Sequence, residues 1–420
     1  MHILYLHQYF ATPNIHGGTR SYSFAKHLTD KAHKVTIVTS NSYLKLNNFR
    51  NKKIIRKTRI DKIDIVVIDV AYSQKMPYFK RILSFIKFMV ISSYFVMKKN
   101  DYDLVFATST PLSIGVPALL AKTRHRIPFI FEVRDLWPEY PQNFGIIKNI
   151  AIIKILEKFS KLLYEKASKV IGISNSMLRR IEQKYDIDSK KLVELPIGAD
   201  LERLDKINSE LINRIKSKYK LDKKFIIGHA GTIGFVNHLE NVIKIAKVFK
   251  KEKDIIFLIV GDGKEKKRLE DEIKRENLNN IYFLGEFNAY ETFSIINIFN
   301  VCLFSILEYD KNGNPTLNSE DALSNKFFDY LAAGKPILMT AKGEITNLMD
   351  KYKFGFYLDM NDNKTIYEQI HQLKCDSILR KKMGHNSKQL AEGIFDRNKM
   401  CKKLEKIFNE LVISKVSNSV

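Results

Sequence analysis

Cysteine, tryptophan and long apolar runs are all scarce in this sequence. It has three cysteines and one tryptophan in 420 residues. The cysteines are too far apart to form a metal knuckle, and they fit a reducing cytosol better than a disulfide framework. The longest apolar run, Ile82 to Met97, is broken by Lys87 and is shorter than the ~20 residues of a membrane-spanning helix. The N-terminus has no basic leader or cleavage site, so we expect no signal peptide and a cytoplasmic protein.

Acidic residues are also in deficit. There are 46 of them against 70 lysines and arginines, which gives a formal net charge of +24. This excess favours an anionic partner, which could be nucleic acid, an anionic membrane surface or a phosphorylated substrate. The basic residues are scattered over both halves, with no Arg-rich arm and no recognisable nucleic-acid module. We therefore expect no nucleic-acid partner, although a basic nucleic-acid-binding protein is a rival that the charge alone would allow.

The sequence does contain a regular alternation of strand and helix patterns. Ile3–Leu6 and Val35–Thr39 have the pattern of strands, and a helix is expected between them at Ser21–Lys31. Such repetition predicts a parallel, doubly wound sheet whose ligands bind at the carboxyl ends of the strands. The chain is long for a single core, so the prediction is an α/β protein with two doubly wound, Rossmann-like domains.

The domain boundary is expected near Gly198, because Pro196 and Gly198 punctuate the chain and the alternation restarts after them. The predicted parts are an N-terminal domain at 1–197, a C-terminal domain at 198–395 and a final helix at 396–420. That helix carries an apolar stripe on one face, so we expect it to pack back on the N-terminal domain. The stripe consists of Met400, Leu404, Ile407, Phe408 and Leu411.

Two places in the first half are candidates for a site. Gly17 and Gly18, followed by Arg20, open a helix at the end of the first strand, where backbone amides can face a phosphate; a tight turn explains the glycines equally well. A second buried strand is followed by Arg134 and Asp135, close to the single tryptophan. Buried unpaired charge is costly, so these residues indicate either a site or a structural Arg–Asp pair.

The most informative stretch of the second half runs from Asp321 to Pro336. Ser324 or Asn325 is a predicted N-cap, and an apolar helix face follows until Gly334. A helix N-terminus attracts anions, and Lys326 adds a full positive charge there. Asp329 lies one turn in, where it can reach sugar hydroxyls. The combination suits a sugar nucleotide, while the alternative is a capped amphipathic helix with surface acids.

Glycine-containing turns also follow two strands of the second half. The turn Gly231–Gly234 leads past His238, which is either a donor to phosphate or an ordinary loop residue. Gly261 follows a strand, where it indicates either a nucleotide-sugar contact or a simple tight turn.

The helix around Ile82–Met97 also has two interpretations. Its stripe of Phe85, Phe88, Met89, Ser92 and Phe95 either lies on an anionic membrane or covers the sheet.

The stretch from Asp321 to Pro336 resembles the signature of retaining family-four glycosyltransferases, which have the GT-B fold. Their motif is two acids separated by seven residues, leading into a helix that ends Ala-x-Gly-x-Pro. Asp321 and Asp329 stand where glutamates are usual. The string Glu-Val-Arg-Asp-Leu-Trp-Pro-Glu at 132–139 resembles a bacterial subgroup typified by the WbuB fucosamine transferases of O-antigen and capsule synthesis. Arg134 stands there in place of the family's histidine.

The resemblance implies two domains facing across a cleft, with a UDP-sugar on the C-terminal one. It implies transfer with retention, no divalent metal, and an undecaprenyl-diphosphate-linked acceptor at the inner face of the plasma membrane. The sugar it suggests is N-acetyl-L-fucosamine or a related amino sugar. Catalytic roles fall on Arg134, Asp135, Asp321 and Lys326. Nucleotide-sugar contacts fall on Gly17, Gly18, Arg20, Thr232, His238, Gly261, Phe287, Ser324, Asn325, Phe327 and Asp329. In many members, an Arg and a Lys stand at Thr232 and His238, and the Phe287 turn holds the base. A GT-B UDP-sugar epimerase would share this fold and nucleotide site.

Overall fold

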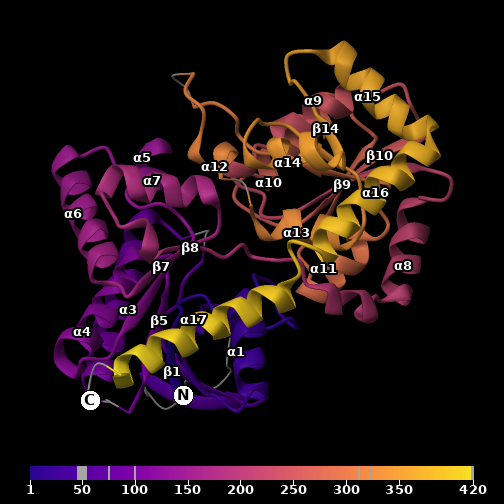
Figure 1. Ribbon diagram of the computed structural model, residues 1–420. Coiled ribbons are helices and arrows are strands. Elements are labelled where there is room, and N and C mark those ends of the chain that lie inside the picture. Colours follow the sequence, from indigo (N-terminus) through magenta and orange to yellow (C-terminus); the bar gives the residue numbers. More distant parts are fainter. Residues whose placement is uncertain (45–53, 74–75, 99–100, 311–312, 322, 418–420) are drawn as a thin grey trace. The chain divides into compact units, whose positions relative to one another are not determined.

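A computed structural model describes residues 1–44, 54–73, 76–98, 101–310, 313–321 and 323–417 (Figure 1). The chain forms two compact units. Unit 1 comprises Met1–Pro196 and the segment that begins at Asn398, and unit 2 comprises Ile197–Arg397. Each unit is a sheet with helices on both faces, and most strands are apolar because they are covered on both faces; the partly exposed, basic edge strand Ile55–Ile60 is an exception.

The sheet of unit 1 has eight strands in the order β3-β4-β2-β1-β5-β6-β7-β8. All neighbours are parallel except β3 and β4, which form an antiparallel hairpin at one edge. The strands are β1 His2–Leu6, β2 Lys34–Ser40, β3 Ile55–Ile60, β4 Ile63–Ile68, β5 Leu104–Thr108, β6 Phe129–Val133, β7 Lys169–Gly172 and β8 Leu192–Glu194. Strand order reverses between β1 and β5, so the carboxyl ends of these strands are where a doubly wound sheet binds ligands.

The described part of unit 1 also contains α-helices, several of which cover the sheet. They are α1 Arg20–Asp30, α2 Asn41–Leu44, α3 Tyr78–Lys98, α4 Gly115–His125, α5 Glu139–Asn143, α6 Ile150–Lys166, α7 Asn175–Tyr185 and α17 Arg397–Ser417. The last of these lies along the unit 1 sheet in Figure 1. Leu404 and Phe408 of α17 are fully buried in the same core as Ile3, and the rings of Phe408 and Phe106 lie 5.4 Å apart. The apolar stripe of the final helix thus completes the core of unit 1.

Unit 2 has six parallel strands in the order β11-β10-β9-β12-β13-β14. They are β9 Phe225–Ala230, β10 Ile255–Val260, β11 Ile281–Gly285, β12 Val301–Phe304, β13 Ile337–Met339 and β14 Gly355–Tyr357. The helices are η4 Leu201–Lys206, α8 Ser209–Tyr219, η5 Phe235–Asn237, α9 Glu240–Val248, α10 Lys266–Arg275, α11 Ala289–Ile296, α12 Leu317–Glu320, α13 Asn325–Ala332, α14 Glu344–Tyr352, α15 Asn363–Cys375 and α16 Ser377–Glu392. Strand order reverses between β9 and β12. The predicted α/β class with two Rossmann-like domains is therefore confirmed.

Candidate functional site

Helix α13 begins at the switch point of the unit 2 sheet. Phe327, Phe328 and Leu331 are fully buried, and this apolar face fixes the helix against the sheet and α16. The Tyr330 hydroxyl accepts a hydrogen bond of 2.8 Å from the Ala230 amide at the end of β9. Gly334 ends the helix with φ of 60°, a conformation that suits glycine. The packing therefore places the first turn of α13 beside the carboxyl end of β9.

The amino end of α13 lacks the predicted side-chain cap. Ser324 occupies the N-cap position, but its hydroxyl accepts no backbone amide and is buried without a partner among the described residues. The Phe327 amide donates to the Ser324 carbonyl at 3.1 Å. The amides of Asn325 and Lys326 have no protein acceptor in the described part of the chain. Two free amides and a buried hydroxyl are the donors that an anion at a helix N-terminus would use.

The prediction that Phe327 contacts the nucleotide sugar is wrong. Its side chain is fully buried, with ring centroids 5.2 Å from Phe328 and 6.3 Å from Phe395. Since its amide is already bonded to Ser324, neither part of the residue is available to a ligand. The donors at this turn come from Ser324, Asn325 and Lys326 instead.

Lys326 brings an ammonium group to the same turn without a carboxylate to pair with. Its Nζ donates to Asn237 Oδ1 at 2.5 Å and to the Ser305 carbonyl at 3.2 Å, and lies 4.2 Å from the ring centroid of Phe304. No described residue forms an ion pair with it. Burial lowers the pKa of Lys326 to about 7. A bound anion would restore the charge that desolvation disfavours.

His229 is a second buried polar group beside Lys326, and sequence reasoning missed it. Its Nδ1 is 3.1 Å from the Leu303 carbonyl, so Nδ1 carries the proton and Nε2 presents a lone pair. Nε2 is buried with no partner among the described residues. Burial, and then Lys326, hold the pKa of His229 well below its usual range. The available signal was a histidine inside the apolar strand Phe225–Ala230.

The glycines of the neighbouring turns are required by backbone packing. A Cβ at Gly261, which has φ of 137°, would lie 1.9 Å from the Gly231 carbonyl oxygen. The tight-turn interpretation thus accounts for Gly261. Thr232 accepts a bond of 2.6 Å from Asn237 Nδ2 through its carbonyl, which orients Asn237 toward Lys326. His238 places its Nδ1 3.3 Å from Glu240, and its role as a phosphate donor stays a prediction.

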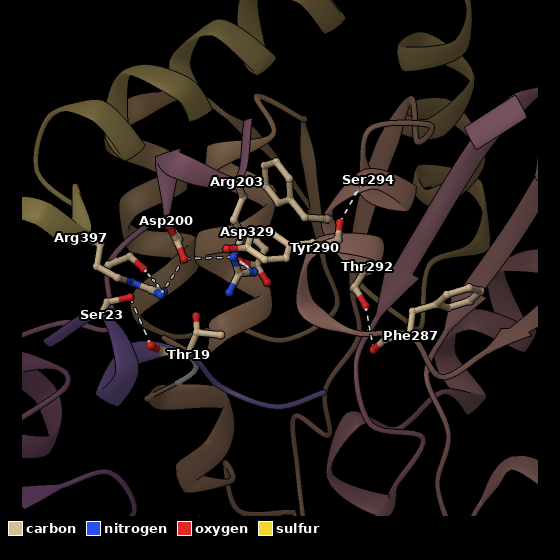
Figure 2. Close-up of polar contacts among 12 residues, drawn as sticks. Thr19, Ser23, Asp200, Arg203, Phe287, Tyr290, Thr292, Ser294, Asp329 and Arg397 are labelled. Carbon is tan, nitrogen blue, oxygen red and sulfur yellow. Dashed lines mark hydrogen bonds and ion pairs between the residues drawn. The ribbon is translucent and has the colours of Figure 1, made fainter. Parts of the chain in front are cut away.

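Asp329 belongs to a chain of alternating charges within unit 2 (Figure 2). Arg203 of η4 donates through Nη1 to Asp329 at 2.9 Å and through Nε to Asp200 at 3.1 Å. Arg397 approaches Asp200 at 3.2 Å and donates to the Gly198 carbonyl at 2.8 Å. Burial raises the pKa of Asp329, and Arg203 opposes this shift. No sequence pattern indicated Arg203, which lies 126 residues from Asp329.

The turn from β11 to α11 lies next to this charge chain. Asn288 and Glu291 form a capping box at the start of α11, and Thr292 donates to the Phe287 carbonyl at 3.4 Å. Figure 2 shows Tyr290 beside Arg203 and Asp329, with Phe287 farther along the same side.

Asp321 follows the short helix α12 and is half-buried, and its carbonyl accepts the Leu323 amide at 2.7 Å.

In unit 1 the structure corrects the prediction for Arg20. Its guanidinium is completely buried, 2.9 Å from Glu132, and it also donates to the carbonyls of Leu195 and Pro196. No part of that side chain is available to a phosphate. Arg20–Glu132 is the structural ion pair at the end of β6, whereas Arg134 and Asp135 form no ion pair with each other among the described residues.

Arg134 and Asp135 are placed by the loop that follows β5. Ser109 Oγ accepts the Arg134 amide at 3.1 Å, and the Thr110 hydroxyl donates to Asp135. The Arg134 charge also faces His7 at the end of β1; burial, and then Arg134, lower the pKa of that histidine well below its usual range. Buried polar atoms of His7 and Gln8 lack partners among the described residues. These groups gather at the switch point of the unit 1 sheet.

Gly17 and Gly18 precede α1 in an exposed turn. Gly17 has φ of 123°, and a Cβ there would lie 3.1 Å from the Ala11 Cβ. The turn therefore needs glycine at position 17 for its own conformation. Thr19 occupies the N-cap of α1 without a side-chain cap.

Helix α3 is apolar on both of its faces. Ser84, Phe88, Ser92 and Val96 are buried against α4 and β4, so the helix covers the sheet. The opposite face leaves large apolar side chains exposed: Phe79, Ile82, Leu83, Ile86, Val90, Tyr94 and Met97. In the part of the chain that the structure describes, no helix is long and apolar enough to cross a bilayer. No group of three or more His, Cys, Asp or Glu side chains there could hold a metal ion.

Comparison with known proteins identifies the class of protein. Residues 17–203 match the family model Glycosyltransferase Family 4, and residues 212–390 match the model Glycosyl transferases group 1. The chain thus belongs to the family-four glycosyltransferases and has their GT-B fold. The narrower subgroup of fucosamine transferases stays a prediction.

Curated relatives and solved structures agree with this placement. An uncharacterised glycosyltransferase of Methanocaldococcus jannaschii is 26% identical over 255 residues, 60% of this chain and 61% of that protein, so the match spans less than two thirds of the relative. The capsular polysaccharide biosynthesis glycosyltransferase CapM of Staphylococcus aureus is 21% identical over 318 residues, 74% of this chain and 77% of CapM.

Two solved structures share the fold over nearly their whole length. Sucrose-phosphate synthase from Thermosynechococcus elongatus has a TM-score of 0.73 at 14% identity, covering 98% of this chain and 99% of that one. Anabaena HepE, solved in complex with UDP, has a TM-score of 0.68 at 15% identity, covering 98% and 100%. At these identities the likeness shows the fold alone.

Proposed function

We propose that this protein transfers a sugar, with retention, from a UDP-sugar to a lipid-diphosphate-linked saccharide in surface polysaccharide synthesis. The observation that carries the proposal is Lys326, a desolvated amine with no anionic partner among the described residues. It lies at a helix N-terminus where the amides of Asn325 and Lys326 have no acceptor among the described residues. Three kinds of hydrogen-bond donor therefore converge where a diphosphate would bind: amides, a hydroxyl and an ammonium. The positive end of the helix dipole lies at the same place.

The chemistry follows from where charge develops. The bond between the sugar C1 and the diphosphate oxygen breaks, and a bond from C1 to the acceptor oxygen forms on the same face. The acceptor hydroxyl loses its proton to an oxygen of the departing diphosphate. Negative charge grows on that diphosphate, so preorganised donors from Ser324, Asn325 and Lys326 stabilise the transition state more than the ground state. Asp321 would hold the donor sugar.

UDP as the leaving group is supported by the arrangement along unit 2. Asp329 lies one turn beyond the amides of Asn325 and Lys326 on α13, so the order of these groups along the helix matches that of diphosphate and ribose. The Phe287 turn lies farther along, where a base would stack or bond to backbone groups. Anabaena HepE, which has the same fold, binds UDP. No metal is invoked, because Lys326 and the helix supply the positive charge.

The acceptor is proposed to bind unit 1. Arg134, Asp135 and His7 gather polar groups at the switch point of its sheet, which suits a hydroxylated saccharide. The exposed apolar face of α3, flanked by Lys80 and Lys87, suits the surface of an anionic membrane in which a lipid-linked acceptor is held. The capsule relative CapM favours surface polysaccharide as the product, and the proposed sugar is N-acetyl-L-fucosamine or a related amino sugar.

A panel of UDP-sugars, incubated with the protein and lipid-diphosphate-linked saccharides, tests the proposal through UDP release and product analysis. We expect release that depends on the acceptor and a product whose new linkage keeps the donor configuration. Release of free epimerised sugar without an acceptor would instead identify an epimerase. Lys326→Ala should lower kcat by roughly 10²–10³-fold, as loss of a preorganised donor does, with a smaller effect on UDP binding. Equal kinetics for wild type and Lys326→Ala would remove the assignment.

A further inference from the structure

Arg203 is a buried arginine that lies between two carboxylates. The residue is 5% exposed, and its guanidinium spans two carboxylates, those of Asp200 and Asp329. Each is met by a different nitrogen, so the planar fork fixes both acids in one geometry. Asp329 is thereby anchored through a single oxygen, Oδ1, at 2.9 Å.

The orientation of Asp329 matters because of its neighbours along unit 2. Its helix begins with the free amides at Asn325 and Lys326, and α11 with the Phe287 turn packs against both α13 and η4. Asp329 therefore lies between the groups suited to a diphosphate and those suited to a base. The aspartate also has one methylene fewer than the glutamate that is usual at this position. A short acid reaches hydroxyls only if its carboxylate is held at the right angle.

We propose that Arg203 is a positioning residue that sets nucleotide affinity and ribose recognition. It holds Asp329 through Oδ1 so that Oδ2 accepts hydrogen bonds from the vicinal hydroxyls of a ribonucleoside diphosphate. This inference rests on the proposed function, since it takes the nucleotide to lie along unit 2 from Lys326 to Phe287. Arg203 acts through Asp329 and forms no bond to the nucleotide itself.

Arg397 provides a matched control for a purely structural role. It is also an almost fully buried arginine that bonds to Asp200, and it donates to the Gly198 carbonyl, whereas Arg203 donates directly to Asp329. If the charge chain only holds unit 2 together, Arg203→Met and Arg397→Met should have similar effects on nucleotide binding. If Arg203 positions Asp329, only the first should weaken ribose recognition.

The experiment measures binding of UDP and of 2′,3′-dideoxy-UDP by titration calorimetry, with thermal melting as a check on folding. Wild type should prefer UDP by roughly 10-fold or more, the size of one hydrogen bond to a charged acceptor. Arg203→Met should lose most of this preference by weakening UDP alone, and KM for the UDP-sugar should rise with little change in kcat. Arg397→Met should keep the preference. Arg203→Lys, which retains the charge and is the variant to use if Arg203→Met does not fold, should lose it in part.

The proposed function and the positioning role of Arg203 can be disproved separately. If wild type binds neither nucleotide and transfers no sugar from a UDP-sugar, the proposed function is wrong. If wild type binds UDP, and Arg203→Met and Arg203→Lys both keep the full preference over the dideoxy analogue, only the positioning role is wrong. Equal weakening of UDP and its dideoxy analogue by Arg203→Met would also overturn it, because the effect would then not pass through the ribose.

Discussion

Lys326 makes nucleotide binding depend on pH. Burial holds its pKa at about 7 in the free protein, far below that of an exposed lysine, so the amine is increasingly neutral above pH 7. A bound diphosphate favours the charged form and raises this pKa, so binding should take up protons. We therefore expect UDP affinity to fall as pH rises above about 7. Calorimetry in buffers of different ionisation enthalpy measures the uptake.

Lys326→Arg is the control for this prediction, because the guanidinium stays charged throughout the range. Its UDP affinity should vary less with pH than that of wild type. Proton release on binding to the wild-type protein, or identical pH profiles for the two proteins, would contradict the assignment of the titrating group to Lys326.

The buried pair Arg20–Glu132 predicts a large effect on stability. Both side chains are completely buried, and their charged atoms are 2.9 Å apart. Arg20→Met leaves Glu132 as an uncompensated buried charge, so the free energy of unfolding should fall by about 3–5 kcal/mol. Denaturant titration measures this. The double variant Arg20→Met with Glu132→Leu should recover much of the loss, and a double variant that is no more stable than Arg20→Met would contradict the argument.

Helix α13 illustrates what a local pattern predicts about an element. The spacing of its aromatic residues and the Gly334 stop predicted a helix, and the structure has one at Asn325–Ala332. The prediction of a side-chain cap was wrong, because the Ser324 hydroxyl accepts no backbone amide and is buried without a partner among the described residues. A cap and an anion site use the same donors, so the sequence pattern for the two is identical. Only the geometry of the side chain separates them.

Helix α3 shows why its two interpretations could not be separated from the sequence. The face of α3 that contains Phe88 and Ser92 is buried and covers the sheet, so it does not lie on a membrane. A second apolar face remains exposed, and a period of 3.6 residues cannot say which of two apolar faces turns inward. Membrane contact by the outer face stays a proposal.

That proposal predicts that α3 binds anionic vesicles. Replacing Ile82, Ile86 and Val90 together by glutamate adds negative charge to the exposed face and should abolish sedimentation with vesicles that contain anionic phospholipid. Wild type should bind them and release them in high salt. Ile378→Glu on α16 is the control, because Ile378 is 79% exposed in unit 2. Unchanged sedimentation of the triple variant, or no wild-type binding at any salt concentration, would contradict it.

For the whole molecule, strand and helix alternation was sufficient to predict the fold class. Each βαβ unit is specified locally, so the pattern survives without knowledge of distant contacts. The charge pairs could not be predicted in the same way. Arg20 meets Glu132 across 112 residues and Arg203 meets Asp329 across 126, and these partners are brought together by the order of strands in each sheet. The sequence patterns therefore led to a wrong prediction that Arg20 contacts a ligand, and they indicated no role for Arg203.

The first turn of α13, with Lys326, is the proposed binding site for the diphosphate of a sugar nucleotide. A crystal structure with UDP is the sharpest test of this site. We expect phosphate oxygens within ~3 Å of Lys326 Nζ and of the amides of Asn325 and Lys326, the distance of charge-assisted hydrogen bonds. A diphosphate bound elsewhere, with Lys326 Nζ still donating only to Asn237 and Ser305, would contradict it.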